Sequence, residues 1–126
     1  MDYIHPTGIR ASGPYTPVVK APPFIFVSGQ GTYDPDTEEK FLGEFSRQAE
    51  LAMANLKRCV ESAHLTMRDL VKVTVYITDI KQLKTFNEVY PRFFDDQKCM
   101  PTRTCVAVSA LPGGMDVEVD ALALVQ

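Results

Sequence analysis

The sequence predicts an α+β fold in which two helices cover one face of a β-sheet. Three patterns lead to this class: apolar residues recur at helical spacing over 44–63, polar and apolar residues alternate over 71–77, and two strand-like runs end the chain at 103–109 and 116–125. With 126 residues, of which 45% are hydrophobic, the chain can bury one core but is too short for two domains. We therefore expect one domain that spans residues 1–126.

The first 40 residues are expected to be mostly extended. Residues 1–17 contain three prolines and two glycines, which leave little room for a helix. A hairpin strand at 18–20 is an option, and the apolar run 24–28, which stops at Gly29, is typical of a short buried strand. The segment 33–40 is rich in Asp, Pro and Thr and is predicted to be a turn.

Two amphipathic helices are expected to form the second layer. Over 44–63, apolar side chains repeat every three or four residues, and charged side chains fall mostly between them. Asp79 has the chemistry of a helix N-cap, and Pro91 indicates a kink or a restart inside the helix that follows. The apolar face of this second helix carries Leu83, Phe86, Tyr90 and Phe94.

The remaining strands imply a partner for the uncovered face of the sheet. The strand at 71–77 alternates with period two and would place four side chains on its inner face: Val71, Val73, Val75 and Ile77. Residues 111–114 form a turn between the last two strands. Residues 121–125 are apolar on both faces of their strand, whereas two helices can cover only one face. Such a face is typical of a subunit interface, so we expect a homo-oligomer.

Charge and cysteine content exclude several classes of protein. The net charge is −3 and the 13 Lys and Arg residues are scattered, so duplex nucleic acid is not expected as a partner. Three cysteines without CxxC spacing argue against a disulfide framework and suit a reducing compartment. The N-terminus does not have the pattern of a secretion signal, and no apolar run approaches the ~20 residues that cross a bilayer. These features predict a cytoplasmic protein without a membrane partner.

Arg103 and Glu118 are candidate charged residues of a functional site. Arg103 is the only charged residue between Met100 and Leu111, and strand alternation points it the same way as Cys105. A buried guanidinium needs an anion. That anion is either Glu118, expected on a neighbouring strand, or the carboxylate of a small ligand, which arginine binds through two parallel hydrogen bonds. Glu118 lies among apolar residues and either pairs with Arg103 or polarises a water as a general acid or base.

Three further side chains are candidates, each with a structural alternative. Asn87 falls on the apolar face of the second helix, where asparagine is a poor helix former, and is either a satisfied core amide or a ligand contact. Tyr15 lies on the proline-flanked arm and is either a packing anchor or a lid over a pocket. Cys105 lies near Arg103, but a catalytic thiol needs a base, and no histidine partner is evident.

The motifs of cofactor-dependent chemistry are missing from the sequence. His5 and His64 have no HxE or PCxxC pattern beside them, which excludes a zinc deaminase. Gly29 and Gly31 do not complete a phosphate-binding loop, and no Ser/His/Asp elbow can be assembled. We therefore expect a reaction that uses neither a metal nor an organic cofactor.

A series of short motifs runs through the chain between residues 13 and 124. They are GPY at 13–15, SGQ at 28–30, Gln48, Asn55, TVYITD at 74–79, Asn87 with Tyr90, PTRTCVAV at 101–108 and VEVDALA at 117–123. In this combination the chain resembles the YjgF/YER057c/UK114 family, also called the Rid or reactive intermediate deaminase family. The RTC segment with a downstream glutamate is similar to the deaminase-active branch of that family.

The resemblance implies a chorismate-mutase-like α+β fold with a mixed sheet, and a homotrimer with a central barrel and ligand clefts between subunits. It also implies hydrolysis of 2-imino and 2-enamino acids, such as 2-iminopropanoate and 2-aminoacrylate, to 2-keto acids and ammonia. Arg103 would bind the substrate carboxylate, and Glu118 with the backbone carbonyl of Cys105 would hold the attacking water. The cleft would be lined by the Gly29 backbone, Ser28, Tyr15 and Asn87.

Other functions stay open for such a fold. One is a deaminase of a single pathway intermediate, such as an aminomuconate or an aminoacrylate. Another is a non-catalytic 2-keto-acid-binding regulator or chaperone-like protein that uses Arg103 only as a carboxylate clamp. A ribonuclease or translation-inhibiting role ranks third, because the net charge of −3 comes without a basic patch.

The sequence departs from the family pattern at three positions. Pro17 stands where the family often has glutamine, and Glu38 stands where a turn glycine is frequent. His64 stands where a glycine usually ends the helix. Because Pro17 is close to Tyr15 in the sequence, it leaves the specificity for the substrate side chain open.

Overall fold

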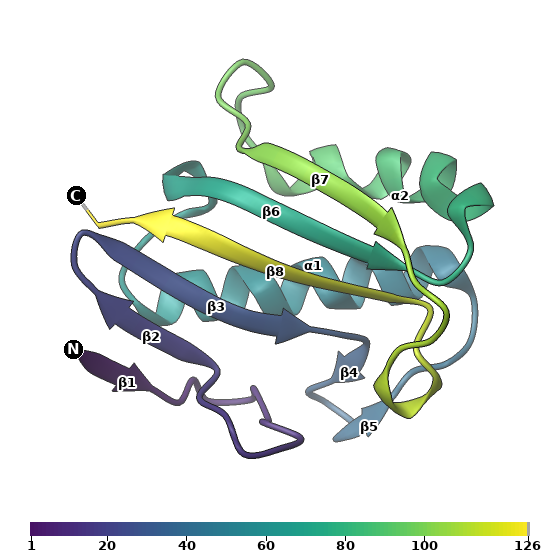
Figure 1. Ribbon diagram of the computed structural model, residues 1–126, viewed down its shortest axis with the longest axis horizontal. Helices are drawn as coiled ribbons and strands as arrows, with labels where there is room; N and C mark the ends of the chain where they lie inside the picture. Colours follow the sequence, from purple (N-terminus) through teal and green to yellow (C-terminus); the bar gives the residue numbers. More distant parts are fainter. Residues whose placement is uncertain (126) are drawn as a thin grey trace.

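The structure is a six-stranded mixed sheet with two helices behind it (Figure 1). This computed structural model describes residues 1–125. In spatial order the strands are β1 (Asp2–Ile4), β2 (Val18–Ala21), β3 (Phe24–Gln30), β8 (Val117–Leu124), β6 (Leu70–Ile77) and β7 (Thr102–Ala107). β6 and β7 run parallel, and the other neighbouring pairs are antiparallel. A small hairpin, β4 (Tyr33–Asp34) with β5 (Glu39–Lys40), forms its own two-stranded sheet.

Both helices pack on the same face of the main sheet, which confirms the predicted α+β class (Figure 1). α1 (Phe45–Ser62) packs on β8 and β3, and α2 (Leu83–Val89) packs beside α1. A 3₁₀ turn over Tyr90–Phe93 follows α2, as the predicted restart at Pro91 requires. No helix in the described part of the chain combines the length and the apolar character needed to cross a membrane.

The structure departs from the sequence prediction in three local details. Asp79 Oδ1 accepts the backbone N–H of Lys81 at 3.0 Å, but it caps a 3₁₀ turn ahead of α2 and not α2 itself. Strand β1 forms within the arm that was predicted to be extended, and it adds a pairing with β2 that the prediction did not include. The prediction that Val71 faces the core is wrong, because Val71 is 39% exposed and Leu70 is buried instead. The pairing of β6 with β8 is irregular between Leu70 and Lys72, which shifts the alternation of faces at this point.

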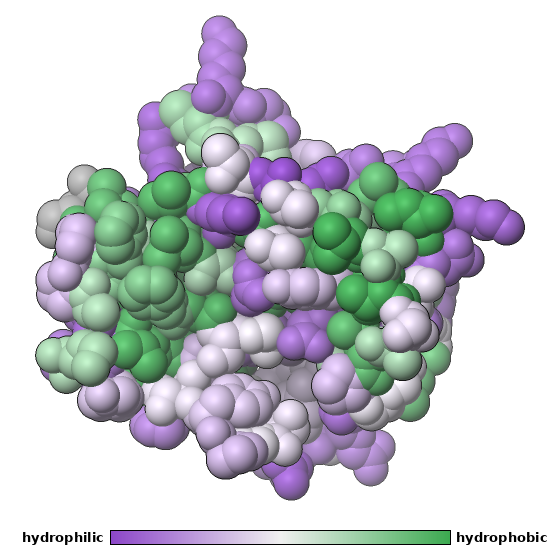
Figure 2. Space-filling view, viewed as in Figure 1, coloured by the Kyte–Doolittle hydropathy of each residue, from purple (hydrophilic) through white to green (hydrophobic). Residues whose placement is uncertain are grey.

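The sheet has a buried face against the helices and an open face on the other side. Along β8, every second residue from Val117 to Ala123 is buried, so the residues between them lie on the open face. Figure 2 shows hydrophobic side chains gathered on this face over the end of the sheet where β8 ends. Paired residues of β3 and β8 supply this apolar patch: Phe24, Phe26, Leu122 and Leu124. This apolar patch is therefore the surface on which we expect the subunit interface.

Two buried amide side chains of α1 hold the segments that lead into β8 and out of β3. Gln48 donates to the Asp116 carboxylate at 3.0 Å and accepts the Asp116 N–H at 2.9 Å. Asn55 donates to the backbone carbonyls of Gly31 at 3.1 Å and Tyr33 at 2.7 Å. Each such bond contributes about 1 kcal/mol, and leaving a buried amide unpaired costs more. α1 therefore fixes the chain on both sides of the cavity described below.

The C-terminus of α1 ends in a cap that requires a left-handed residue. The Leu65 N–H donates to the Val60 carbonyl at 3.3 Å, and the His64 N–H donates to the Glu61 carbonyl at 2.9 Å. This pair of bonds is the Schellman motif, in which glycine usually occupies the position of His64. His64 has φ +62°, and a conformation of this kind costs a residue with a Cβ about 1–2 kcal/mol. Glu38, the other departure from a family glycine, has φ +61°.

We predict that His64→Gly raises the free energy of unfolding by about 1 kcal/mol, because glycine adopts a φ of +62° without the steric cost. For a domain of this size the gain corresponds to a rise in Tm of about 4 °C, measured by thermal unfolding. His64→Ala is the control, since alanine removes the exposed imidazole but keeps the strained φ. An equal rise in Tm for both variants would contradict the assignment of strain to this residue.

Candidate active site

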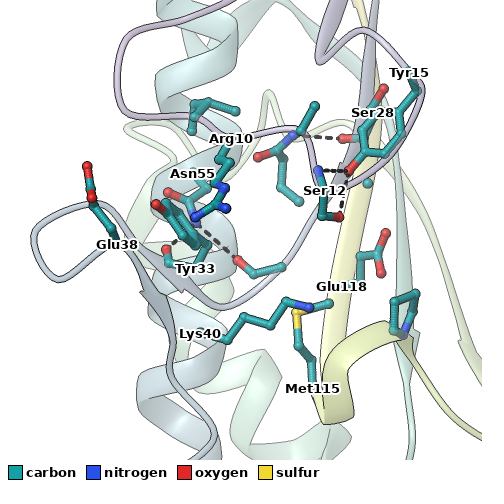
Figure 3. Close-up of a pocket in the computed structure, with 16 residues that line it drawn as sticks. Arg10, Ser12, Tyr15, Ser28, Tyr33, Glu38, Lys40, Asn55, Met115 and Glu118 are labelled. Carbon is teal, nitrogen blue, oxygen red and sulfur yellow. Dashed lines mark hydrogen bonds between the residues drawn. The ribbon is translucent and has the colours of Figure 1, made fainter.

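A cavity of about 710 Å³ opens beside β3 and β8 (Figure 3). Its walls come from the N-terminal arm at 9–15, from 28–33, from the hairpin at 38–40 and from the turn at 112–115. A volume of this size is ordinary for a small-molecule site. Four of the residues predicted for the site line it: Tyr15, Ser28, Gly29 and Glu118.

A β-bulge and a glycine allow the Glu118 carboxylate to lie against β3. The pairing of β3 with β8 gains one residue between Val27 and Gln30, and Gly29 lies within this bulge. A Cβ added to Gly29 would collide with the Glu118 carboxylate. Any other residue at position 29 would therefore displace the carboxylate from the cavity wall.

The half-buried Glu118 carboxyl has a pKa above its usual range. Burial is the largest cause and the nearby Asp120 adds to it, whereas the Lys40 ammonium lowers the pKa. A carboxyl with a raised pKa binds its proton more tightly than an ordinary carboxyl, which favours a group that both accepts and returns a proton. This is the property that a general acid and base needs in a hydrolysis.

Ser28 and Tyr15 shape the cavity through the N-terminal arm. Ser28 Oγ donates to the Thr16 carbonyl at 2.6 Å, and the Ser28 N–H donates to the Pro17 carbonyl at 2.9 Å. The Tyr15 hydroxyl accepts the Ser12 N–H at 3.2 Å (Figure 3). Ser28 thus anchors the arm to β3, and Tyr15 closes one side of the cavity. Pro17 is buried and does not line the cavity of its own chain.

Arg103 lies on the helix side of the sheet, over two aromatic rings. On β7 it is paired with Val73 of β6, which is fully buried against the helices. The guanidinium carbon of Arg103 lies 4.9 Å from the centroid of the Tyr90 ring and 5.8 Å from that of Phe86, within the range of cation–π attraction. Burial raises the pKa of Tyr90 to about 12, so this aromatic platform is uncharged. Within residues 1–125 no carboxylate forms an ion pair with Arg103.

Arg103 and Glu118 cannot meet within one chain. The expectation that they lie on neighbouring strands is wrong, because β6 lies between β7 and β8. Glu118 is paired with Tyr76 on the open face, whereas Arg103 is paired with Val73 on the helix face. The intramolecular ion pair, one of the two alternatives from the sequence, is therefore absent. Glu118 faces the cavity, and Arg103 lies on the aromatic platform.

Cys105 and Asn87 lie outside the cavity. Cys105 is paired with the buried Val75 and shares the face of Arg103, as predicted. Burial raises the pKa of the Cys105 thiol and Arg103 lowers it to a smaller extent, so the thiol is mostly protonated near neutral pH. The expectation that Asn87 lies on the apolar face of its helix is wrong. Asn87 is exposed, because it is rotated by about 100° from the buried Phe86.

Two groups that lie beside these side chains were not predicted from the sequence. Phe86 and Tyr90 were expected only as core residues, although their helical spacing ahead of an isolated Arg103 is a usable signal. Lys40 and Arg10 line the cavity, and they lie in turn and arm segments without any periodic pattern. Within the described part of the chain no three His, Cys, Asp or Glu side chains are grouped so that they could hold a metal ion.

The chain matches known proteins along most of its length. The family profile described as endoribonuclease L-PSP covers residues 6–125. A protein of Escherichia coli K12 named as a reactive intermediate deaminase, TdcF, is 41% identical over 115 residues, which are 90% of this chain and 88% of that protein. A RutC family protein of Pyrococcus abyssi is 40% identical over 111 residues, which are 88% of this chain and 86% of that protein.

Solved structures agree with these sequence matches. The crystal structure of E. coli TdcF with bound serine has a TM-score of 0.86 at 39% identity, covering 92% of this chain and 91% of that chain. RidA from an Antarctic Psychrobacter has a TM-score of 0.92 at 32% identity, covering 99% of this chain and 100% of that chain. These likenesses confirm the fold that the resemblance implied. The chain therefore belongs to the endoribonuclease L-PSP family, which is the YjgF/Rid family of reactive intermediate deaminases.

Proposed function

We propose that this protein hydrolyses 2-imino and 2-enamino acids, such as 2-iminopropanoate and its tautomer 2-aminoacrylate, to 2-keto acids and ammonia. The site would be shared between two chains of a homotrimer, with Arg103 from one chain and the cavity with Glu118 from its neighbour. Family membership supports a deaminase-type role. The serine bound to E. coli TdcF supports a ligand with an α-carboxylate. The three free cysteines of the chain suit the cytoplasm, where we place the protein.

The observation that carries the proposal is the separation of Arg103 and Glu118 by the sheet. They lie on opposite faces with a strand between them, so one small ligand cannot contact both in a single chain. A second copy that covers the apolar patch brings a neighbouring chain to the open face, which also carries Glu118. A cleft between two chains can then hold a guanidinium and a general acid–base group around the same ligand.

Arg103 supplies recognition in this scheme. Its planar guanidinium binds a carboxylate through two parallel charge-assisted hydrogen bonds, which fixes the direction of the substrate as well as its position. The aromatic platform of Phe86 and Tyr90 stacks against the guanidinium and restricts its orientation. Because no carboxylate in residues 1–125 forms an ion pair with Arg103, its guanidinium is available to a ligand.

Glu118 supplies proton transfer. Water attacks the carbon of the protonated imine, the C–O bond forms, and the π electrons of the C=N bond move to nitrogen while Glu118 accepts a proton from the water. Glu118 then returns the proton to nitrogen and takes up the proton of the new hydroxyl group. The oxygen lone pair forms the C=O bond as the C–N bond breaks, and ammonia leaves the 2-keto acid. The Cys105 carbonyl of the neighbouring chain would hold the water from the other side. Since the imine is already electrophilic, it is sufficient to place the reactants and to transfer protons through one carboxyl group.

The oligomeric state is the first test. We expect light scattering to give three times the mass of one chain, because the apolar patch on the open face has no cover within the chain. Phe26 is 49% exposed at this patch, and Phe26→Lys should shift the mass towards the monomer and remove deaminase activity. Leu42→Lys is the matched control, since Leu42 is 53% exposed outside the main sheet and its change should leave the mass unaltered. A wild-type protein that is a monomer would remove the basis of the shared site.

Substitution of the two charged residues tests their roles. Arg103→Lys should lower kcat/KM for 2-iminopropanoate about a hundredfold or more, because lysine keeps the charge but loses the planar fork. The imine is generated in place by an amino acid oxidase, and its disappearance is followed. Glu118→Gln should lose turnover to a similar degree but retain pyruvate binding, because Glu118 acts on water and not on the carboxylate. A lowered Tm and lost pyruvate binding in both variants would favour a structural role instead.

Mixed oligomers test whether the site is shared. When Arg103→Lys and Glu118→Gln chains are unfolded together and refolded in equal amounts, random assembly restores an intact pair at about one quarter of the sites. Deaminase activity should therefore recover to about a quarter of the wild-type value, while each variant refolded alone stays inactive. No recovery in oligomers of the correct mass would mean that both residues act within one chain or do not act together. Binding of pyruvate by a wild-type protein without any turnover would identify a non-catalytic 2-keto-acid binder.

Cys105 is expected to contribute its backbone and not its thiol. Cys105→Ser should keep deaminase activity within about tenfold of the wild type, because the thiol is mostly protonated and imine hydrolysis needs no covalent step. The measurement is imine turnover by a folded trimer. A loss as large as that of Arg103→Lys would show that the sulfur takes part.

A further inference from the structure

The cavity beside Glu118 is larger and more charged than a three-carbon imino acid requires. Its volume of about 710 Å³ lies within the range of ~300–1,000 Å³ that is typical of sites for much larger ligands. Besides Glu118, three charged side chains line it: Arg10, Glu38 and Lys40. The proposed hydrolysis uses none of these three. These three side chains are therefore candidates for contact with the part of the substrate that does not react.

We propose that the cavity selects 2-imino acids with a second carboxylate at the end of the side chain, and that Lys40 is the residue that recognises this carboxylate. The inference rests on the proposed function, because it takes Arg103 of the neighbouring chain to hold the α-carboxylate. The reacting carbon then lies next to Glu118. The substrate side chain, on the far side of that carbon, enters the cavity.

Lys40 is exposed to solvent, but its side chain points into the cavity. It is the last residue of β5, and its side chain extends toward Met115 and Glu118 (Figure 3). The ammonium lies so close to the turn before β8 that a Cβ on Gly113 would collide with it. Gly113 has φ +73°, so the turn itself uses a glycine at this point. The same ammonium lowers the pKa of Glu118, which places its charge near the reaction centre.

The cations of the cavity have no carboxylate partner among residues 1–125. Within residues 1–125 no carboxylate oxygen lies within 4.0 Å of a charged nitrogen of Lys40 or Arg10. Glu38 lies at the edge of the view with its carboxylate turned away from Lys40 (Figure 3). Glu118 is the other carboxylate of the lining and is engaged in proton transfer in the proposed reaction. Two cations are therefore presented to the side chain of a ligand.

This distribution of charge favours an anionic side chain over an apolar one. An alkyl group in the cavity would displace water from the Lys40 and Arg10 cations and would return no hydrogen bond, which is unfavourable. A carboxylate replaces the lost hydrogen bonds with charge-assisted ones. The lysine ammonium is a point charge on a flexible stem, so it can serve side chains of different lengths. The imino acids derived from aspartate and glutamate have this chemistry.

Binding of keto acids tests the selectivity without turnover. The ligands are 2-oxoglutarate and 2-oxopentanoate, which share a five-carbon chain and differ in the distal carboxylate. Titration calorimetry should show 2-oxoglutarate binding about tenfold more tightly, in line with one hydrogen bond to a charged group. Lys40→Met should abolish this preference, and Lys40→Arg should retain most of it.

Turnover gives the second measurement. The corresponding imines, 2-iminoglutarate and 2-iminopentanoate, are generated by amino acid oxidases, and the ratio of their kcat/KM values is compared between variants. Lys40→Met should lower this ratio about tenfold. The ratio is the right quantity, since a change in the pKa of Glu118 affects both imines alike. Lys57→Met makes the same change of charge on the exposed side of α1 and should leave the ratio unaltered.

The outcomes separate this inference from the deaminase function itself. An unchanged ratio in Lys40→Met, with the pH profile of both imines shifted together, would mean that Lys40 only adjusts Glu118 and would overturn the inference. A wild-type preference for 2-iminopentanoate would overturn it as well, with the deaminase function intact. A protein that prefers 2-oxoglutarate through Lys40 but hydrolyses neither imine would support the selectivity and reject the deaminase.

Discussion

The alternation of side chains along β7, β6 and β8 is the constraint on which the rest of the structure depends. Successive residues of a strand point to opposite faces, and paired residues of neighbouring strands point to the same face. Arg103 is paired with the buried Val73 and therefore points to the helix face. Glu118 is paired with Tyr76 and points to the open face. One sheet thus presents a cation on its helix side and a carboxylate on its open side. A single chain therefore holds Arg103 and Glu118 apart, and the proposed site would need one group from each of two chains.

The carboxylate half depends on contacts that lie outside the sheet pairing. Asn55 of α1 holds the carbonyls that follow β3, and Gln48 holds Asp116 just before β8 begins. Between these anchors, the bulge at Gly29 leaves room for the Glu118 side chain. A helix that appears remote from the chemistry therefore sets the position of both cavity walls. These contacts give the two buried amides on the inner face of α1 a structural role.

Much of the fold could be predicted from the sequence, since both helices and the central strands have clear periodicity. Two of the errors have local causes: an irregular pairing of β6 with β8 exposes Val71, and the rotation of about 100° per residue within α2 exposes Asn87. The site was harder, because strand patterns do not record which strands are neighbours. Arg103 and Glu118 were recognisable as charges in apolar segments, yet β6 lies between their strands. Lys40 is in a short hairpin whose place beside the cavity depends on contacts distant in sequence.

The stacking of Arg103 on its aromatic platform has a thermodynamic consequence. An arginine side chain carries about 2 kcal/mol of rotamer entropy, which a flexible surface arginine loses when a ligand binds. Contact with Tyr90 at 4.9 Å and Phe86 at 5.8 Å restricts the guanidinium as the chain folds, before any ligand arrives. For the proposed ligand, less side-chain freedom would then be lost on binding, and a larger part of the electrostatic attraction would appear as affinity. For ligands as small as the proposed imino acids, such preorganisation would raise the affinity.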